Sequence, residues 1–205
     1  MENFVITIAR QYGSGGRTVG KMLAEKLGVS FYDKQIIQMA SDESGIDVKL
    51  FGQVEEGSSV KASLFNKTGL YKGDLFAPDQ KGFVSDENIF NYQAKIIKEV
   101  AAEESCVIIG RCADFILKDN PDVVRLFFYA PKEDCIARVK TQNGGTEKEI
   151  IRKIEKTDKY RSDYYRYHTG KDWNDSRNYD FCLNTASMSY EKLVAVVKAY
   201  IEQYR

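Results

Sequence analysis

The segment that most constrains the fold of this chain lies near its amino-terminal end. Phe4 to Ile8 reads FVITI, an apolar run rich in β-branched residues, which is typical of a strand buried in a parallel sheet. The glycine-rich stretch Gly13-Ser14-Gly15-Gly16-Arg17-Thr18 follows. Apolar residues then recur at helical spacing: Val19, Met22, Leu23 and Leu27. Gly28 is a suitable residue to end that helix. This order of strand, glycine-rich loop and helix predicts a phosphate-binding loop.

The residue types in this loop suit an anionic ligand. Gly13, Gly15 and Gly16 permit backbone conformations that other residues resist, and they let main-chain amides approach a ligand closely. Those amides converge at a helix amino terminus, where unpaired N–H groups and the helix dipole favour phosphate. Thr18 offers a hydroxyl where such loops hold Mg²⁺. The predicted nucleotide-binding residues are therefore Gly13, Ser14, Gly15, Gly16, Arg17 and Thr18. The alternative is a glycine-rich turn without a ligand.

Strands and helices alternate along the rest of the chain. The further predicted strands are 31–32, 106–109, 123–129 and 179–183. One predicted helix carries Ile36, Ile37 and Ala40, and Asp33 would cap it. Further helices are predicted at 86–104, at 147–168 and from about Leu193. This alternation predicts a three-layer α/β fold, with a parallel sheet of about five strands flanked by helices. A ligand should bind outside the carboxyl ends of the strands.

Composition argues against several classes of protein. Lys and Arg together number 30, as do Asp and Glu, so no overall charge favours nucleic acid or a membrane surface. No stretch approaches the roughly 20 apolar residues of a membrane-spanning helix, and the amino terminus lacks a basic leader. The cysteines are widely spaced, which favours reduced packing thiols: Cys106, Cys112, Cys135 and Cys182. We expect a cytoplasmic protein that binds small molecules; the sequence leaves open a homo-oligomer.

The amino-terminal loop resembles that of cytidylate kinases, which ends in lysine, glycine and threonine. The strand, the Gly-Ser-Gly turn, Thr18 and the helix that follows all match. In this register Gly16 occupies the lysine position, Arg17 the next, and Arg10 the position of the first glycine. The lysine bridges the transferred phosphates, so its loss calls for a replacement. Arg17 is the first candidate and Arg10 the second.

Further segments resemble the cytidylate-kinase-like group, a P-loop family of the nucleoside-monophosphate-kinase type. Asp33 stands where cytidylate and shikimate-type kinases place a strand-end aspartate near the metal or the acceptor. Arg111 matches the arginine of the cytidylate kinase Asp-Gly-Arg, although Ile109 occupies the aspartate position. Other matching segments are Asp158-Lys159-x-Arg161, Tyr164-Tyr165, Thr169-Gly170-Lys171-x-Trp173, Asn178-Tyr179-Asp180 and Leu183-Asn184-Thr185. The resemblance covers nearly the whole chain.

This resemblance implies one P-loop NTPase domain over residues 1–205. Its core would comprise about 1–34 and 105–205, a helical insertion at about 35–104 would bind the acceptor, and a lid at about 140–170 would close over the phosphates. The implied activity is phosphoryl transfer from ATP, with Mg²⁺ as cofactor. The implied acceptor is a nucleoside monophosphate, with CMP as the first candidate, or a related small molecule. A mobile excursion is expected at 57–82, which is rich in Gly, Ser, Lys and Asp.

The catalytic residues implied by the resemblance are Arg17, Asp33, Arg111 and Arg161, with Thr18 orienting Mg²⁺. Arg161 can also be interpreted from its spacing, because it lies seven residues after Ile154 and so shares the apolar face of its helix. An inward arginine is costly unless it is paired or faces a ligand. Asp158, three residues earlier, is a possible structural partner, and we favour the alternative in which Arg161 faces the phosphate cleft.

Two other functions stay open at this point. The first is a nucleotide- or anion-binding module that no longer catalyses, which Gly16 in the lysine position and Ile109 in the aspartate position both favour. The second is a nucleic-acid-binding protein, for which the support is a local basic stripe at Arg152, Lys156, Lys159 and Arg166. Such a stripe is more often a solvated helix face.

Overall fold

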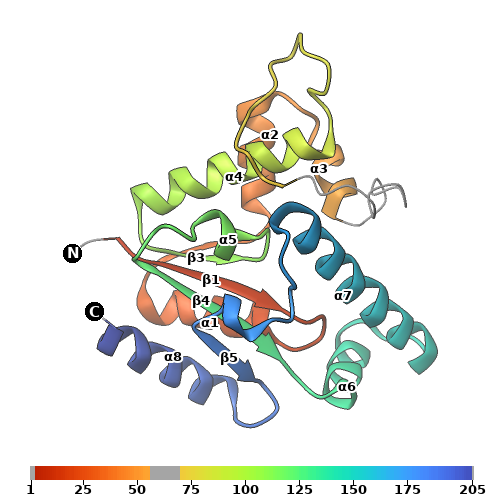
Figure 1. Ribbon diagram of the computed structural model, residues 1–205. Helices are drawn as coiled ribbons and strands as arrows, with labels where there is room; N and C mark the ends of the chain where they lie inside the picture. Colours follow the sequence, from red (N-terminus) through yellow and green to blue (C-terminus); the bar gives the residue numbers. More distant parts are fainter. Residues whose placement is uncertain (1–2, 56–69, 205) are drawn as a thin grey trace.

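The computed structural model describes residues 3–55 and 70–204, and a parallel sheet lies at its centre (Figure 1). Its five strands are β1 (Val5–Arg10), β2 (Ser30–Tyr32), β3 (Cys106–Ile109), β4 (Val123–Tyr129) and β5 (Phe181–Asn184). They lie in the order β2-β3-β1-β4-β5, and every pair of neighbours is parallel. The predicted parallel sheet of about five strands, flanked by helices, is therefore confirmed.

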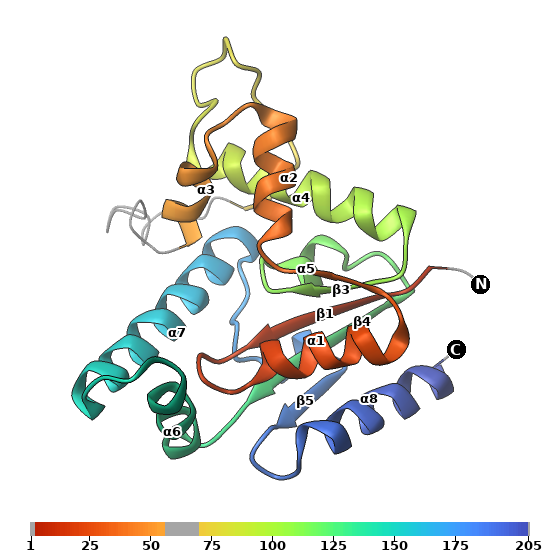
Figure 2. The same ribbon diagram turned by 180° about the vertical axis from the view of Figure 1, so that it is seen from behind.

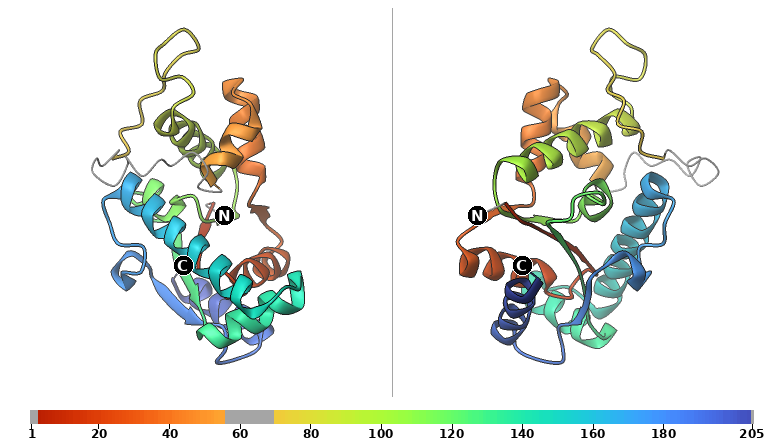
Figure 3. Two further views of the ribbon diagram at one scale, coloured as in Figure 1. Left: turned by 90° about the vertical axis from the view of Figure 1, so that its right-hand side faces the viewer. Right: turned by 60° about the vertical axis from the view of Figure 1, so that its left-hand side comes forward.

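Helices cover both faces of the sheet. On one face α1 (Gly16–Leu27) and α8 (Tyr190–Tyr204) lie side by side, as Figure 2 shows. The opposite face is covered by α4 (Asp86–Glu103) and α5 (Ala113–Ile116), with α2 (Gln35–Ser44) packed on α4. The views in Figure 3 show the sheet between these two helical layers. The remaining helices are α3 (Val48–Glu55), α6 (Lys132–Asn143), α7 (Glu147–Thr169) and the short 3-10 helix η2 (Ser176–Asn178).

Strand β1 shows why the strands are apolar at successive positions. Val5 and Ala9 belong to the hydrophobic cluster under α2, α4 and α5, whereas Ile6 and Ile8 belong to the cluster under α1 and α8. All four residues are buried. Because successive side chains of a strand point to opposite faces, a strand covered on both sides must be apolar throughout. The predicted buried strand is confirmed, and it extends from Val5 to Arg10.

The carboxyl ends of the strands point toward α7, the longest helix (Figure 1). Thr146 begins α7 with a capping box, in which its hydroxyl accepts from the Glu149 N–H and the Glu149 carboxylate accepts from the Thr146 N–H. Gly170, in the left-handed conformation, ends it. The basic stripe predicted on this helix is exposed, which agrees with a solvated face: Arg152, Lys156, Lys159 and Arg166. The helix thus places its other face over the strand ends.

The prediction that Asp33 caps a helix is wrong. α2 begins at Gln35 after Lys34, and no side-chain hydrogen bond caps it. The Asp33 carboxylate is instead occupied by Arg17. A helical segment is expected after the strand 106–109, and α5 occupies that place. The short helix α3 was not predicted, because it is not long enough to show a helical period. Of the segment expected to be an excursion, 57–69 lies outside the described residues, and 70–82 contains no helix or strand.

Two expectations from composition can be compared with the structure. Among the residues described, no helix combines the length and the apolar character that crossing a membrane requires. All four cysteines are free thiols, and three of them are buried: Cys106, Cys112 and Cys135. Burial raises the pKa of the Cys106 thiol to about 12, which is consistent with an inert packing role.

Candidate functional site

The glycine-rich loop joins β1 to α1 at the carboxyl end of the sheet. Gly13 and Gly15 adopt left-handed conformations, with φ of 79° and 84°, which residues with a Cβ rarely adopt. Gly15 also serves as the residue before α1, so the helix begins without a side-chain cap. In the first turn the Gly16 N–H donates to the Ser14 hydroxyl at 3.3 Å. The helix dipole favours an anion at this end of α1. The backbone has the form that the sequence predicted.

Arg138 of α6 makes hydrogen bonds to the glycine-rich loop and to Thr185. Arg138 donates one Nη1 hydrogen bond to the Ser14 carbonyl at 2.9 Å and another to the Thr185 hydroxyl at 3.0 Å, and its Nη2 donates to the Thr185 carbonyl at 3.1 Å. The Thr185 hydroxyl also donates to the Ser14 carbonyl. These contacts draw the loop carbonyl toward α6 and β5. Sequence reasoning missed Arg138, which stands in an ordinary charged helix and carries no local signal.

Helix α7 makes hydrogen bonds to the backbone where β1 ends and the loop begins. The Tyr12 N–H donates to Asp158 Oδ1 at 2.7 Å, and Arg161 Nη1 donates to the Arg10 carbonyl at 3.0 Å. Arg161 also lies 3.5 Å from Asp158, so it is both paired and turned toward the strand ends. Burial raises the pKa of Asp158 to about 6, although the Tyr12 N–H and the two nearby arginines oppose the rise. Arg161 is therefore paired with Asp158, and it also lines the pocket beside the loop.

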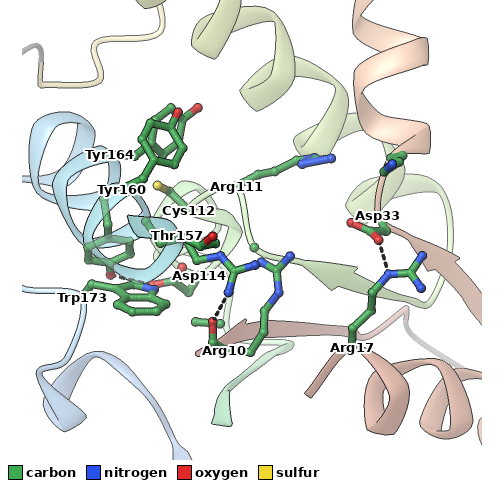
Figure 4. A pocket seen from close by; sticks show the side chains of 15 residues that line it. Arg10, Arg17, Asp33, Arg111, Cys112, Asp114, Thr157, Tyr160, Tyr164 and Trp173 are labelled. Atoms are coloured by element: carbon green, nitrogen blue, oxygen red, sulfur yellow. Dashed lines mark hydrogen bonds and ion pairs between the residues drawn. The ribbon is translucent and has the colours of Figure 1, made fainter. Parts of the chain in front are cut away.

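A pocket of about 300 Å³ opens beside the loop, at the carboxyl ends of β1 and β3 (Figure 4). Four arginines line it: Arg10, Arg17, Arg111 and Arg161. Asp114 and four aromatic residues also line it: Tyr160, Tyr164, Tyr165 and Trp173. Four guanidinium groups around one cavity repel each other, so their assembly favours an anion with more than one charge. The predicted residues Asp33, Arg17, Arg111 and Arg161 all reach this one pocket.

Arg17 and Asp33 form an ion pair within the pocket. Arg17 Nε lies 2.6 Å from Asp33 Oδ2, and the Arg17 side chain is 61% exposed against 10% for Asp33. Figure 4 shows the two side chains meeting at one edge of the cavity. The Arg17 guanidinium also lies 6.0 Å from the ring of Phe31 in β2. Arg17 thus faces the end of β2, the edge strand of the sheet.

Arg111 lies on an unusual stretch of backbone that directly follows β3. Gly110, Arg111 and Cys112 have φ of 70°, 57° and 55°, so three consecutive residues are left-handed. For residues other than glycine this conformation costs about 1–2 kcal/mol each. Such strain is found where the surrounding structure holds a side chain in a functional position. Here it turns the Arg111 side chain into the pocket (Figure 4).

Asp114 forms the buried acidic part of the pocket wall. Its Oδ2 accepts a hydrogen bond from the Tyr165 hydroxyl at 2.6 Å, and the residue is 7% exposed. Burial raises its pKa to about 6, while the Tyr165 hydroxyl and Arg125 pull it down. This pair links α5 to α7 across the pocket. Sequence reasoning did not single out Asp114, although it lies only three residues after Arg111.

The residues present would fit Mg²⁺ in the manner of P-loop enzymes. Among the described residues, no group of three or more His, Cys, Asp and Glu side chains could hold a metal by itself. Mg²⁺ often has few protein ligands and binds mainly to substrate phosphates and water. The exposed hydroxyl-bearing residue Thr18, in the first turn of α1, is placed to supply one such ligand.

A model of the cytidylate kinase-like family matches residues 5–187. The chain belongs to that family. It is 27% identical to a cytidylate kinase from Methanopyrus kandleri over 207 residues, covering 97% of this chain and 93% of the relative. It is likewise 27% identical to a cytidylate kinase from Pyrococcus horikoshii, covering 98% and 90% of the two chains.

Solved structures agree with the fold. An uncharacterized protein from Eubacterium ventriosum aligns over 98% of this chain and 99% of its own, with a TM-score of 0.71 and 26% identity. A shikimate kinase from Bacteroides thetaiotaomicron aligns over 97% of this chain and 98% of its own, with a TM-score of 0.56 and 16% identity. Family and fold together make this chain a P-loop nucleotide kinase.

Proposed function

We propose that this kinase transfers a phosphoryl group from ATP, with Mg²⁺, to a nucleoside monophosphate, with CMP as the first candidate acceptor. The observation that carries the proposal is the pocket lined by four arginines directly beside the glycine-rich loop. A loop of backbone amides suits the phosphates of the donor, and a neighbouring cluster of guanidinium groups suits both the phosphoryl group in transfer and the phosphate of an acceptor. The curated relatives named cytidylate kinases support CMP as acceptor.

The proposed roles follow from position. The amides at Gly13 to Thr18 hold the donor phosphates, and Thr18 orients Mg²⁺, which when bound would neutralise charge on those phosphates. Asp33, held by Arg17, supports the metal or the acceptor. Arg111 and Arg161 neutralise charge on the phosphoryl group as it moves. Because such transfer needs little covalent help from the protein, positioning of these groups would supply most of the catalysis.

The proposed division of the chain assigns a part to each substrate. Residues of about 35–104, which include α2 and α4, form the acceptor-binding insertion, and about 140–170, which includes α7, forms the lid. The rest is the core of a single domain. The proposed partners are small nucleotides in the cytoplasm, with no role for nucleic acid.

A nucleotide-binding module without turnover is the second candidate, because Gly16 supplies no cation at the lysine position. One experiment separates the two. ADP release is measured by a coupled assay with ATP, Mg²⁺ and CMP, dCMP, UMP, AMP or GMP, with shikimate as a non-nucleotide acceptor. Thermal unfolding is measured with and without ATP on the same samples. We expect ATP to raise the unfolding temperature and one pyrimidine monophosphate to give the fastest ADP release. ATP stabilisation without turnover on any acceptor would favour the module.

A further inference from the structure

We propose that Arg10 supplies the cation for the donor phosphates that a lysine at position 16 supplies in other P-loop enzymes. In the usual loop, position 10 is glycine and position 16 is lysine. Here position 16 is glycine and position 10 carries the cation, so the charged side chain comes from the end of β1 instead of the start of α1. The inference rests on the proposed binding of ATP at the loop, and it concerns which residue completes that site.

The first support is steric. A Cβ placed on Gly16 would lie 2.8 Å from Cβ of Arg10 and 2.7 Å from Cβ of Phe128. Both distances are shorter than real Cβ contacts allow. Residues 10 and 16 therefore face each other across the base of the loop, where Phe128 also packs, and a side chain at 16 would meet both Arg10 and Phe128. A glycine at 16 is what lets position 10 carry an arginine.

The second support is the path of the Arg10 side chain. Figure 4 shows it rising from the end of β1 into the pocket, between the aromatic side chains on one side and the Arg17–Asp33 pair on the other. A Cβ on Gly110 would lie 2.3 Å from Arg10 Nη1. The absence of a side chain at Gly110 thus clears the guanidinium's position at the end of β3. The guanidinium thus lies in the pocket beside the turn that carries Arg111, on a residue that ends the strand leading into the glycine-rich loop.

Arg17, the candidate favoured by the sequence, is directed elsewhere. Its Nε is 2.6 Å from Asp33, at the end of β2, and β3 lies between β2 and β1 in the sheet. Arg10 instead belongs to the last position of β1 and is fixed through its own carbonyl, which accepts from Arg161 Nη1 at 3.0 Å. The backbone from which the Arg10 side chain extends is thus fixed, and a guanidinium can bind two phosphate oxygens at once. Arg17 then serves the acceptor side.

The test compares nucleotides that differ in their phosphates. The dissociation constants of ATP, ADP and AMP are measured for the parent, Arg10→Met, Arg10→Lys and Arg17→Met. The control for loss of a positive charge is Lys26→Met, at an exposed position in the last turn of α1. We expect Arg10→Met to weaken ATP by about tenfold to a hundredfold and AMP much less, because a charge-assisted hydrogen bond to the outer phosphates is lost. Arg10→Lys should recover part of the loss. Arg17→Met should weaken ATP less than Arg10→Met does.

A second pair of variants tests the exchange itself and does not depend on catalysis. Gly16→Lys alone should lower the unfolding temperature, and Gly16→Lys with Arg10→Gly should lower it less, because the contact with Arg10 is then relieved. Both variants keep the contact with Phe128, so their difference reports Arg10 alone. Additive effects of the two changes, or unchanged ATP binding in Arg10→Met, would overturn the inference. If the parent itself does not bind ATP, the proposed donor site fails instead.

Discussion

The phosphate loop and the arginine-lined pocket lie side by side, yet they are built by opposite means. The loop offers main-chain amides, and its shape depends on left-handed glycines and on contacts from Arg138 and Asp158. The pocket offers long side chains that come from β1, α1, α7 and the turn after β3. Main-chain amides can bind a phosphate group whatever the rest of the ligand is. The side chains of the pocket, by contrast, can each be substituted separately. Under the proposed function, donor binding by the loop and acceptor binding by the pocket can therefore be tested separately.

The largest expected effect comes from breaking the loop. Gly15→Val should weaken ATP binding by at least about a hundredfold, because the φ of 84° resists a side chain and the amides that bind phosphate would move. A Cβ there would also lie 2.1 Å from the Tyr190 hydroxyl oxygen. ATP affinity is measured by calorimetry on protein whose circular dichroism matches the parent.

The matched control is Gly28→Val at the other end of the same helix. Gly28 is also left-handed, with φ of 67°, but nothing lies within 4 Å of its Cβ position. This variant should lose stability and keep its affinity for ATP. Equal loss of affinity in both variants would mean that backbone strain in α1, and not the shape of the loop, explains the effect.

The second prediction distinguishes the pocket from the loop, because the substitution should impair use of the acceptor and leave ATP binding nearly unchanged. Arg111→Ala should lower kcat/KM for the acceptor by about a hundredfold, as expected when one charge-stabilising group is removed. ATP affinity should change by less than about threefold. Steady-state kinetics with each substrate varied in turn checks this. Similar losses for ATP and acceptor would place Arg111 at the donor phosphates.

Arg111→Gly extends this test to strain. Both variants remove the guanidinium, but glycine accepts the φ of 57° and alanine does not. We expect the glycine variant to be more stable than the alanine variant by about 1 kcal/mol. Chemical denaturation measures the difference, and equal stabilities would show that the turn relaxes when the arginine is gone.

A smaller effect is expected at Arg17, where the two regions meet. Arg17→Lys should lower kcat by about tenfold, close to the effect of Arg17→Ala, because lysine has no Nε to meet Asp33. Acceptor kinetics at saturating ATP gives the comparison. Full activity in Arg17→Lys would show that charge alone, without the geometry of the pair, is sufficient.

The smallest effect concerns pH and the contact between α7 and the loop. Burial raises the pKa of Asp158 from 3.8 to about 6, so the folded state holds that proton more tightly than the unfolded state does. Asp158 therefore stabilises the fold at low pH, and this contribution is lost as the pH rises through 6. Asp158→Asn does not titrate, so its unfolding free energy relative to the parent should rise between pH 4 and 6. Denaturation at several pH values measures this, and a constant difference would contradict the buried, titrating carboxyl.

The sequence by itself determined the local parts of this protein. The β1–loop–α1 unit, the parallel strands and the choice of Asp33 and Arg111 followed from periodicity, glycine placement and resemblance, since each depends on residues close together in the chain. It could not show that Arg10 fills the space opposite Gly16, or that Asp33 holds Arg17 instead of capping α2. Those outcomes depend on which side chains lie next to each other once the strands and helices have packed together.

Tertiary structure alone decided how the loop is supported. Arg138 and Ser14 are 124 residues apart in the chain, and Asp158 and Tyr12 are 146 apart. A local pattern cannot encode such pairs, because an arginine on a charged helix has the same signature whether it faces solvent or a backbone carbonyl. Only the packing of α6 and α7 against the strand ends turns these residues toward the loop. The sequence predicted the glycine-rich loop between a strand and a helix, and the fold decided which distant side chains contact it.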